Sequence, residues 1–299
     1  MEHFDIVALG FCSNDYLALL PEIPLDNKVQ ILEHLVQGGG PAATAAVAAA
    51  RLGKKAAFIS VVGDDDPGKT ILRDLENEKV CTSGMKIRAN SNSALAYCWV
   101  DKNTGNRSVA WTRGNLAELE ADEVDMEMVR NAGILHLDGH NPKAALAAAK
   151  EARKHGVKVS IDAGTLRDGM RELLPHVDIL IASELFARQY SGSDDPEKAV
   201  YQLAENGAET VGVTMGRLGS ITLQNNKLYR CPAFPIVPVD TTGAGDVYHG
   251  AYCVRYLETH DPMECMRFAA AVAALKCLKS GGRTGIPNRE QVNEFLKNN

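Results

Sequence analysis

Residues 42–62 read AATAAVAAARLGKKAAFISVV, and this stretch decides the fold class. Its first half, Ala42 to Leu52, consists almost entirely of strong helix formers, and Gly53 with two lysines behind it is typical of a helix end. Its second half, Ala56 to Val62, is a short apolar run that Gly63 ends. Such a run predicts a buried strand, so the stretch predicts a helix followed directly by a strand.

The same alternation continues on both sides of this stretch. Phe4 to Leu9 (FDIVAL) is a similar apolar run, so the N-terminal part of the chain predicts strand, helix, strand. Strands that alternate with helices predict an α/β fold with a mostly parallel central sheet covered on both faces. The further predicted strands are Ile134–Leu137, Lys158–Ile161, Ile179–Ile181 and Thr210–Thr214, and the predicted helices between them include Lys143–His155 and Pro196–Asn206.

Two segments interrupt this alternation. Residues from about 13 to 37 form a long connection with two prolines, and residues 93–111 read as a β-hairpin around the turn 103–106. Long insertions in compact domains are usually lids or binding loops, so we predict a small β-sheet lid from the segments of about 13–37 and 91–113. No linker divides the chain, and residues 1–299 are predicted to form a single domain.

The composition is that of a chain with an ordinary apolar core and a modest acidic charge. The 299 residues are 45% hydrophobic and 23% charged, and 32 Lys plus Arg against 38 Asp plus Glu give a net charge of −6. Because no basic strip and no long apolar run is present, we expect neither nucleic acid nor a membrane as a partner. Seven scattered cysteines without a C-x-x-C pair favour reduced thiols and a cytoplasmic protein.

Residues 63–70, GDDDPGKT, match the phosphate-binding pattern G-x-x-x-x-G-K-[ST]. A loop of that kind wraps backbone N–H groups around phosphate groups. Here three consecutive aspartates would place negative charge beside the phosphate, and Pro67 has no N–H to donate. We therefore interpret the stretch as an acidic turn between a strand and a helix, with carboxylates near the helix N-terminus.

Residues 235–250, PIVPVDTTGAGDVYHG, carry the strongest indication of chemistry. The strand-like run PIVPV leads through small residues into a predicted helix. Gly243, Ala244 and Gly245 allow a phosphate to approach the backbone, and their N–H groups at a helix start would form an anion hole. Asp246 follows in the first turn, where a carboxylate suits a general base that takes the proton of an attacking hydroxyl. From the residues alone, the alternative is that Asp246 caps the helix.

This motif resembles the C-terminal signature of the ribokinase family of carbohydrate kinases, the phosphofructokinase B (PfkB) group. Residues 38–53, GGGPAATAAVAAARLG, resemble the N-terminal signature, and residues 62–65 (VGDD) and 214–219 (TMGRLG) match further family positions in the same order. The resemblance implies a ribokinase-like three-layer αβα domain with a small β-sheet lid. It also implies an ATP-dependent carbohydrate kinase that uses Mg²⁺ and transfers the γ-phosphate to a sugar hydroxyl.

The resemblance implies roles for individual residues. Asp246 is similar to the catalytic base of the family, and the backbone from Gly243 to Gly245 is similar to its anion hole. Asp15 resembles the carboxylate that binds sugar hydroxyls, and Gly39 and Gly40 resemble glycines that lie against the sugar. The positions similar to the nucleotide-phosphate loop are Thr214, Gly216 and Gly219.

Metal sites and a dimer are implied in the same way. The site where many members bind a monovalent cation such as K⁺, mostly through backbone carbonyls, is similar to Asp240, Thr242, Gly281 and Gly285. Where many members have N-x-x-E near the Mg²⁺-linked phosphates, this chain has Ser183-Glu184-Leu185-Phe186, which leaves open whether Glu184 takes the place of the usual glutamate. A homodimer formed through the β lid is also expected.

Within the family the chain most resembles sulfofructose kinase-like members, yet it departs from common sugar-binding patterns. Thr44 stands where many members have an asparagine. Lys28 resembles a lysine that can contact an anionic group of the substrate. His140 and Arg113 lie at or near positions that recognise a sulfonate in those members. A permanent cation suits a sulfonate better than an imidazole does. The acceptor stays open between a ketose, a sulfofructose-like sugar and other polyols. The alternatives are a nucleoside or inositol kinase and a catalytically idle sugar or nucleotide sensor.

Overall fold

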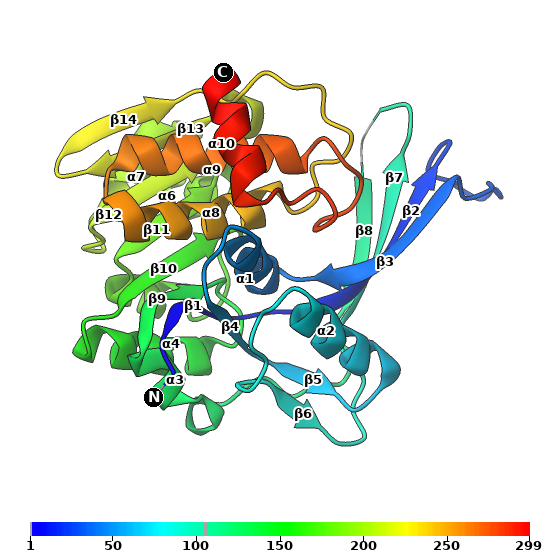
Figure 1. The fold of residues 1–299 in the computed structure, drawn as a ribbon, viewed down its shortest axis with the longest axis horizontal. Helices are drawn as coiled ribbons and strands as arrows, with labels where there is room; N and C mark the ends of the chain where they lie inside the picture. The colour runs from blue at the N-terminus through cyan, green and yellow to red at the C-terminus, as the bar shows by residue number, and fades with distance from the viewer. Residues whose placement is uncertain (1, 105–106) are drawn as a thin grey trace.

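An eight-stranded sheet runs through the centre of the molecule (Figure 1). The structure is a computed structural model that describes residues 2–104 and 107–299. The strands of this sheet are β1 (Phe4–Leu9), β4 (Ala56–Ile59), β9 (Ala132–Leu137), β10 (Lys158–Ala163), β11 (Ile179–Ser183), β12 (Thr210–Thr214), β13 (Ser220–Gln224) and β14 (Lys227–Cys231). Their spatial order is β14-β13-β12-β11-β10-β9-β1-β4, and the six strands from β12 to β4 are parallel. The predicted mostly parallel sheet is confirmed.

The parallel strands end together at one edge of the sheet. Leu9 of β1 pairs with Leu137 of β9, and Ser183 of β11 pairs with Thr214 of β12. Each of these strands is a short apolar run that is buried almost throughout, as a parallel strand covered on both faces must be. In open α/β sheets ligands bind outside these carboxyl ends, so the functional residues are expected along this edge.

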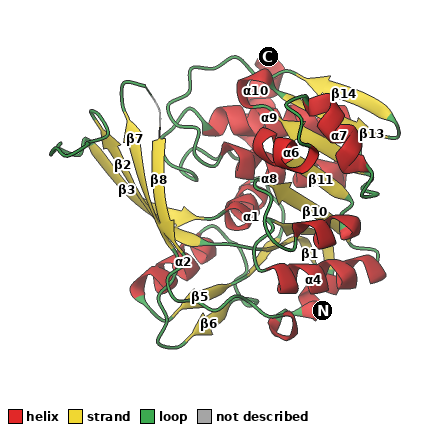
Figure 2. Cartoon of the chain, turned by 180° about the vertical axis from the view of Figure 1, so that it is seen from behind, coloured by secondary structure: helices red, strands yellow, loops and turns green. Residues whose placement is uncertain are grey.

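Helices cover both faces of the central sheet (Figure 2). Helices α3 to α7 pack with the sheet into one apolar core, and α1, α2, α8, α9 and α10 pack into a second core on the opposite face. Within residues 2–104 and 107–299, no helix has the length and apolar character needed to cross a membrane. The helices are α1 (Pro41–Arg51), α2 (Asp66–Asn77), α3 (Met126–Arg130), α4 (Pro142–Lys154), α5 (Met170–Leu173), α6 (Glu184–Ser191), α7 (Pro196–Ala204), α8 (Ala244–Thr259), α9 (Pro262–Lys276) and α10 (Arg289–Asn298), with short 3₁₀ turns at Ala121–Glu123, Leu174–His176 and Gly216–Leu218.

The alanine-rich stretch forms helix α1, as predicted. Its N-cap is Gly40, whose φ of 96° lies in a region that favours glycine, and Pro41 occupies the first turn. Small side chains let α1 pack closely against α8, because a Cβ on Gly250 would collide with the backbone of Ala45. The two signature stretches of the sequence therefore lie side by side in the fold.

A second, smaller sheet projects from the body of the molecule (Figure 1). It has the spatial order β3-β2-β7-β8 and comes from the two interrupting segments. The β7–β8 pair is the antiparallel hairpin that was predicted, although residues 105–106 of its turn lie outside the described residues. We call these four strands the small sheet: β2 (Ser13–Leu20), β3 (Glu33–Gly39), β7 (Leu95–Asp101) and β8 (Arg107–Thr112).

Two predicted strands differ from those in the structure. The run from Ala56 to Val62 is split, because the buried Ser60 hydroxyl donates to the Gly10 carbonyl at 2.6 Å and the chain leaves the central sheet there. The residues after it form β5 (Val61–Gly63), which pairs with β6 (Lys86–Arg88) in a separate two-stranded sheet. The run PIVPV at 235–239 forms no strand, since two of its five residues are prolines without an N–H to pair.

The GDDDPGKT stretch is an acidic helix start. Asp65 is the N-cap of α2, where its Oδ1 accepts a hydrogen bond from the Gly68 N–H at 3.0 Å. The Asp64 carboxylate accepts the backbone N–H groups of Asn90 and Ser91. Lys69 pairs at the surface with Asp66, at 3.2 Å. The Asp65 carboxylate thus already occupies the Gly68 N–H, one of the backbone donors that a phosphate in this turn would need.

Candidate active site at the ends of the parallel strands

Helix α8 begins at the carboxyl edge of the central sheet with backbone N–H groups that no side chain caps. Its N-cap is Gly243, with a φ of 74°, and Ala244 and Gly245 are the first helical residues. Asp246 follows in the first turn, as predicted from the sequence, but it is not the cap residue. A Cβ placed on Gly245 would meet nothing within 4 Å. The Ala244 N–H donates to the Thr241 carbonyl at 3.2 Å. No side chain occupies the N–H groups at this helix N-terminus, which suits an anion.

The Asp246 carboxyl group lies in an environment that disfavours its charge. Burial raises the pKa of Asp246 to about 7, and the negative charge of Asp162 adds to that rise. The His249 imidazole and the Arg107 guanidinium act in the opposite direction. Arg107 comes from the small sheet, and its Nη1 donates to the Thr241 hydroxyl at 3.3 Å, so the small sheet reaches the loop before α8. A carboxyl with a pKa near 7 can take up and release a proton at neutral pH.

Asp162, at the end of β10, belongs to a buried polar cluster beside α8. Its Oδ1 lies 3.2 Å from Nε2 of His249. Burial alone would raise the pKa of Asp162, but the charge and hydrogen bond of His249 lower it overall. His136 lies further inside, and burial lowers its pKa to about 3, so this imidazole is neutral. In the part of the chain that the structure describes, no group of three or more His, Cys, Asp or Glu could hold a metal ion.

Asp138 is a buried residue at this edge that the sequence analysis did not single out. Its Oδ2 accepts the backbone N–H groups of Phe11 at 2.8 Å and Ala42 at 3.2 Å, and its Oδ1 accepts the His140 N–H at 3.0 Å. Burial raises the pKa of Asp138 to about 6. One carboxylate thus holds together the ends of β1 and β9 and the start of α1. Its position directly after the strand ILHL was the signal available in the sequence.

Asp15 lies at the start of the small sheet, against the glycine-rich stretch. Its Oδ1 accepts the Ser13 hydroxyl at 2.5 Å, and a Cβ on Gly39 would collide with its carboxylate. Burial raises the pKa of Asp15, while the Ser13 hydrogen bond and the Arg283 charge lower it. A Cβ on Gly40 would meet the Phe11 carbonyl. The structure therefore brings Asp15, Gly39 and Gly40 together.

Thr44 is engaged by a buried arginine. Arg283 donates from Nε to the Thr44 hydroxyl at 3.2 Å and from Nη2 to the Gly39 carbonyl at 3.0 Å, while its Nη1 is buried without a partner. The guanidinium fills the space beside Gly38, where a Cβ would collide with it. Arg283 stands in the loop SGGRTG, residues 280–285, but nothing local in the sequence indicates that it reaches Thr44. The Thr44 hydroxyl, which stands where many members of the resembled family have an asparagine, thus already accepts a hydrogen bond from Arg283.

Arg113 and His140 meet on the other side of Phe11. Arg113 Nη2 lies 2.6 Å from His140 Nδ1, and the His140 ring stacks on Phe11 with 4.8 Å between centroids. Burial, with the charges of Arg167 and Arg113, lowers the pKa of His140 to about 3, so its ring is neutral. Trp111 contacts the edge of Phe11 at 6.0 Å between centroids. Arg113 and His140 therefore lie together, and Arg113 carries the positive charge of the two.

Lys28 is the predicted substrate residue that the structure keeps apart from the others. It lies exposed in the loop between β2 and β3. In the register of these strands Asp15 pairs with Gln37 at one end, whereas Leu19 pairs with Glu33 at the end where the loop begins. Within one chain, Lys28 and Asp15 therefore lie at opposite ends of the small sheet.

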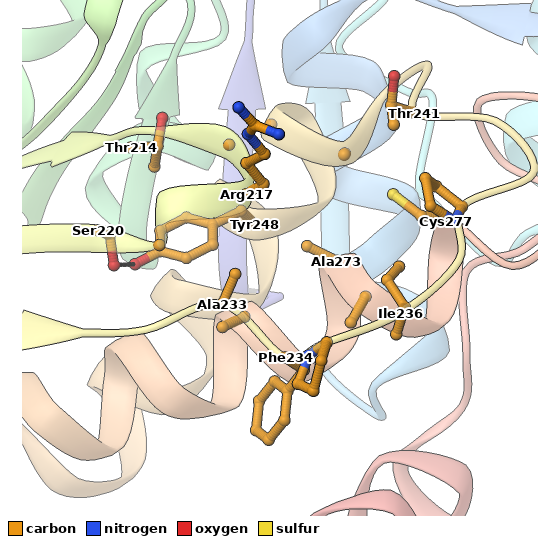
Figure 3. A pocket seen from close by; sticks show the side chains of 18 residues that line it. Thr214, Arg217, Ser220, Ala233, Phe234, Ile236, Thr241, Tyr248, Ala273 and Cys277 are labelled. Carbon is orange, nitrogen blue, oxygen red and sulfur yellow. Dashed lines mark hydrogen bonds between the residues drawn. The ribbon is translucent and has the colours of Figure 1, made fainter. Parts of the chain in front are cut away.

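A cavity of about 450 Å³ lies beside the α8 N-terminus (Figure 3). Thr214 and Thr241 lie on one side of it, and Phe234 and Ile236 lie on the other. The Tyr248 hydroxyl shares a hydrogen bond of 3.0 Å with Ser220 inside it. The predicted phosphate-loop residues and the start of α8 line the same cavity: Thr214, Gly216, Gly219, Ala244 and Gly245.

Ser183 ends β11, where it pairs with Thr214 of the cavity wall, and Glu184 begins α6. The Ser183 hydroxyl caps α6 by accepting the Phe186 N–H at 3.1 Å, and it donates to the Gly164 carbonyl at 2.8 Å. Glu184 is exposed in the first turn of α6. Ser183 is therefore occupied by the backbone, while the Glu184 carboxylate faces solvent next to the strand that carries Thr214.

Asp240 fixes the loop that leads into α8. Its Oδ1 accepts the Thr242 N–H and its Oδ2 accepts the Gly281 N–H, each at 2.8 Å. The Asp240 carbonyl accepts the buried Lys276 ammonium at 2.9 Å. Gly285 packs against the Lys276 carbonyl, where a Cβ would collide. The four predicted cation-site positions are thus close together around a lysine that the sequence analysis left unassigned.

Known proteins are similar to this chain over most of its length. The pfkB family carbohydrate kinases match residues 4–289. The chain is 32% identical to a ribokinase of Haemophilus influenzae over 267 residues, covering 87% of each chain, and 34% identical to an ATP-dependent ribose-1-phosphate kinase of Halopiger xanaduensis over 303 residues, covering 97% of each. The solved structure of Arabidopsis thaliana ribokinase complexed with ribose and ATP superimposes with a TM-score of 0.85 at 28% identity, covering 99% of both chains.

Proposed function

The chain belongs to the pfkB family of carbohydrate kinases, and from this membership we propose that it transfers the γ-phosphate of ATP to a hydroxyl of a small sugar. The observation that carries the proposal is the placement of Asp246. It stands in the first turn of α8, directly after the turn from Gly243 to Gly245, which no side chain caps, and beside the 450 Å³ cavity. In this proposal Asp246 is the general base, and the turn is the anion hole for the transferring phosphoryl group.

The properties of Asp246 suit proton transfer. A general base works best when its pKa lies near the working pH, and burial brings the pKa of Asp246 to about 7. The ionised carboxylate takes the proton of the acceptor hydroxyl as the oxygen attacks phosphorus. The N–H groups of Gly243, Ala244 and Gly245 then stabilise the charge on the phosphoryl oxygens. A protein that only senses sugar would not need a carboxylate at this position.

We propose that the acceptor sugar binds between the small sheet and the carboxyl edge of the central sheet. Asp15 accepts hydrogen bonds from its hydroxyls, and the missing side chains of Gly39 and Gly40 let it approach the backbone. Arg283 holds the glycine-rich side of this site in place by donating hydrogen bonds to the Thr44 hydroxyl and the Gly39 carbonyl.

The far wall of the acceptor site is formed by Arg113 and the neutral His140. Arg113 also pairs with Glu118 at 3.2 Å, so part of its charge is already balanced. This arrangement supports a hydroxyl-rich acceptor and leaves a guanidinium in place for an acceptor with an anionic group, such as a sulfofructose-like sugar.

ATP binds, in this proposal, in the 450 Å³ cavity. Phe234, Ile236 and neighbouring alanines give it an apolar wall for the base, and Thr214, Gly216 and Gly219 lie toward the phosphates. Mg²⁺ usually keeps several waters and binds one or two carboxylates together with substrate phosphates, so the absence of a three-ligand cluster among the described residues fits it. In this proposal Glu184, exposed at the start of α6, binds the water shell of the ion. When bound, Mg²⁺ would neutralise phosphate charge.

The small sheet supports a homodimer. Tyr16, Val36 and Tyr97 share one of its faces by register, and Tyr16 and Tyr97 stack at 5.2 Å between centroids. Val36 is 40% exposed and Tyr97 is 47% exposed, so this face is apolar and uncovered. We propose that it pairs with the same face of a second copy. Sedimentation or light scattering should then give twice the mass of one chain, and Tyr97→Glu should give monomers.

A binding panel followed by a turnover assay tests the proposed function. Ribose, deoxyribose, ribose 1-phosphate, fructose, sulfofructose, inositols and nucleosides are each added to the protein with a non-hydrolysable ATP analogue. A specific acceptor stabilises the fold and raises Tm. We expect a small sugar to give the largest shift and then to support ADP release with ATP. A nucleoside as the best acceptor would change the substrate class, and ligand binding without ADP release would favour a sensor.

A further inference from the structure

Lys276 is a lysine without solvent contact. It is the last residue of α9, its side chain is fully buried, and its Nζ donates to the Asp240 carbonyl at 2.9 Å. Lysine is almost never fully buried unless its charge is paired, because removing an ammonium from water is costly. A buried lysine at this place therefore calls for an explanation.

Asp240 supplies the balancing charge. Its carboxylate is fixed by the N–H groups of Thr242 and Gly281, and its carbonyl holds the ammonium. These hydrogen bonds and the charge of Lys276 keep the pKa of Asp240 low despite burial. Burial lowers the pKa of Lys276, and the charge of Asp240 opposes that shift. The two residues form a buried pair of opposite charges.

This pair stands directly behind the loop that forms the proposed anion hole. The Cys277 carbonyl, next to Lys276, accepts the N–H groups of Val239 at 2.8 Å and Asp240 at 3.2 Å. The end of α9 thus binds both the carbonyl and the N–H of Asp240: Lys276 donates to the carbonyl, and the Cys277 carbonyl accepts the N–H. The charge of Asp246 also acts on the Lys276 ammonium, so the two groups are electrostatically coupled.

A free monovalent cation does not fit beside this lysine. The family resemblance places such a cation on backbone carbonyls around Asp240, but that carbonyl already binds the Lys276 ammonium. A second buried cation in the same place would be repelled by the first, and repulsion between close charges is strong away from water. The residues present therefore disagree with the expected potassium site.

We propose that the Lys276 ammonium takes the place of the monovalent cation, so that this kinase carries a covalently attached cation and needs no potassium. Lys276 is a positioning residue: it orients the Asp240 peptide and supplies a fixed positive charge behind the turn from Gly243 to Gly245. The inference rests on the proposed function, because that turn is the proposed anion hole.

The first test uses the unmodified protein. Turnover is measured in the chloride salts of K⁺, NH₄⁺, Na⁺ and N-methylglucamine at one ionic strength, so that general screening is constant. Since screening is constant, we expect kcat to vary by no more than about twofold among the four salts. Activation by K⁺ of about tenfold or more over N-methylglucamine would overturn the proposal, since a loss of that size is typical of a missing electrostatic contact.

The second test removes the ammonium in two ways. Lys276→Ala leaves room for a cation at Asp240, whereas Lys276→Met fills the same space without charge. We expect both variants to lose about 10- to 100-fold in kcat in N-methylglucamine chloride. NH₄⁺ and K⁺ should restore Lys276→Ala and leave Lys276→Met inactive. Equal behaviour of both variants in every salt would show a merely structural role and would overturn the proposal.

Thermal unfolding gives a readout that requires no turnover. NH₄⁺ and K⁺ should raise the Tm of Lys276→Ala relative to N-methylglucamine, and they should not do so for the unmodified protein or for Lys276→Met, because a cation that binds only the folded state stabilises it. No cation-specific shift in Lys276→Ala would count against the proposal even if no acceptor were found. Failure of the acceptor panel alone would leave this result standing. If neither variant folds, the salt series on the unmodified protein decides.

Discussion

Nε2 of His249 lies 3.2 Å from Oδ1 of Asp162, and both side chains are buried. His249 stands three residues after Asp246 on α8, so the pair lies directly beside the proposed base. The negative charge of Asp162 raises the pKa of Asp246, and His249 lowers it. The proton affinity of Asp246 is therefore set by residues from two different elements, β10 and α8.

Asp246→Asn should remove most of the turnover while leaving the fold and ATP binding intact. The amide keeps the size of the side chain but cannot accept the hydroxyl proton, so kcat should fall by roughly 10² to 10⁴-fold. The measurement is ADP release by the purified variant, with binding of an ATP analogue as the control. A kcat near that of the unmodified protein would show that another group is the base.

The same variant should change the pH dependence of stability. The pKa of Asp246 in the fold is about 7 against an ordinary 3.8, so the folded state binds this proton more tightly than the unfolded state. The stability that this provides is complete at pH values below the ordinary pKa and is lost as the pH rises to about 7. Asp246→Asn has no such loss, so its Tm relative to the unmodified protein should rise between about pH 4 and pH 7.

The activity of the unmodified enzyme should rise through neutral pH. The base must be ionised, so kcat/KM should increase with pH around the pKa of about 7 and then level off. Asp162→Asn removes a negative charge that raises this pKa, and the midpoint should therefore move to lower pH by about half a unit or more. ATP titrates equally in both assays, so the difference between the two profiles belongs to the protein. An unchanged midpoint would separate Asp162 from the proton transfer.

The features that the sequence predicted are local in the chain. Helix α1 follows from its alanines, and the α8 N-terminus follows from a glycine turn before a helical run. Asp246 could be placed because its position relative to that turn is fixed within a few residues. The acidic start of α2 is equally local, since Asp65 caps a helix that begins at Asp66.

The residues that the sequence did not predict act across long separations. Asp138 bonds the N–H of Phe11, 127 positions away, and Arg283 bonds Thr44, 239 positions away. Lys276 bonds Asp240, 36 positions away. Their side chains have ordinary sequence neighbours, and only the packing of distant elements gives them a role. The prediction of a strand at PIVPV, residues 235–239, was wrong for a different reason. The apolar pattern is present, but its two prolines have no N–H to pair in a sheet.

Lys69→Ala should have little effect on ATP binding and turnover. Lys69 pairs at the surface with Asp66, and the Gly68 N–H of its turn already donates to Asp65. We expect kcat and the KM for ATP to stay within about threefold, whereas a lysine that contacts the β- and γ-phosphates would be costly to lose. Asp65→Ala is the matched variant, and it should cost about 0.5–2 kcal/mol of stability as a lost N-cap. Loss of ATP binding in folded Lys69→Ala would identify this turn as a phosphate site.

Lys28→Ala should leave the KM for a neutral sugar within about twofold, because rim charges affect mainly charged partners. In its own chain Lys28 is exposed and lies at the opposite end of the small sheet from Asp15. The comparison is made with a neutral sugar and with an anionic one such as a sulfosugar. A rise in KM for the neutral sugar would place Lys28 within the acceptor site in spite of this separation.

Asp15→Ala should separate the acceptor from the nucleotide. If the Asp15 carboxylate accepts hydrogen bonds from sugar hydroxyls, its loss leaves those hydroxyls without an acceptor in a site that excludes water. The KM for the sugar should then rise strongly, with a loss of about 2–4 kcal/mol in kcat/KM, while the KM for ATP stays nearly unchanged. Gly39→Ala provides an independent perturbation, since its Cβ would collide with the same carboxylate, and it should also impair the sugar selectively. Equal losses for sugar and ATP in Asp15→Ala would place this carboxylate outside the acceptor site.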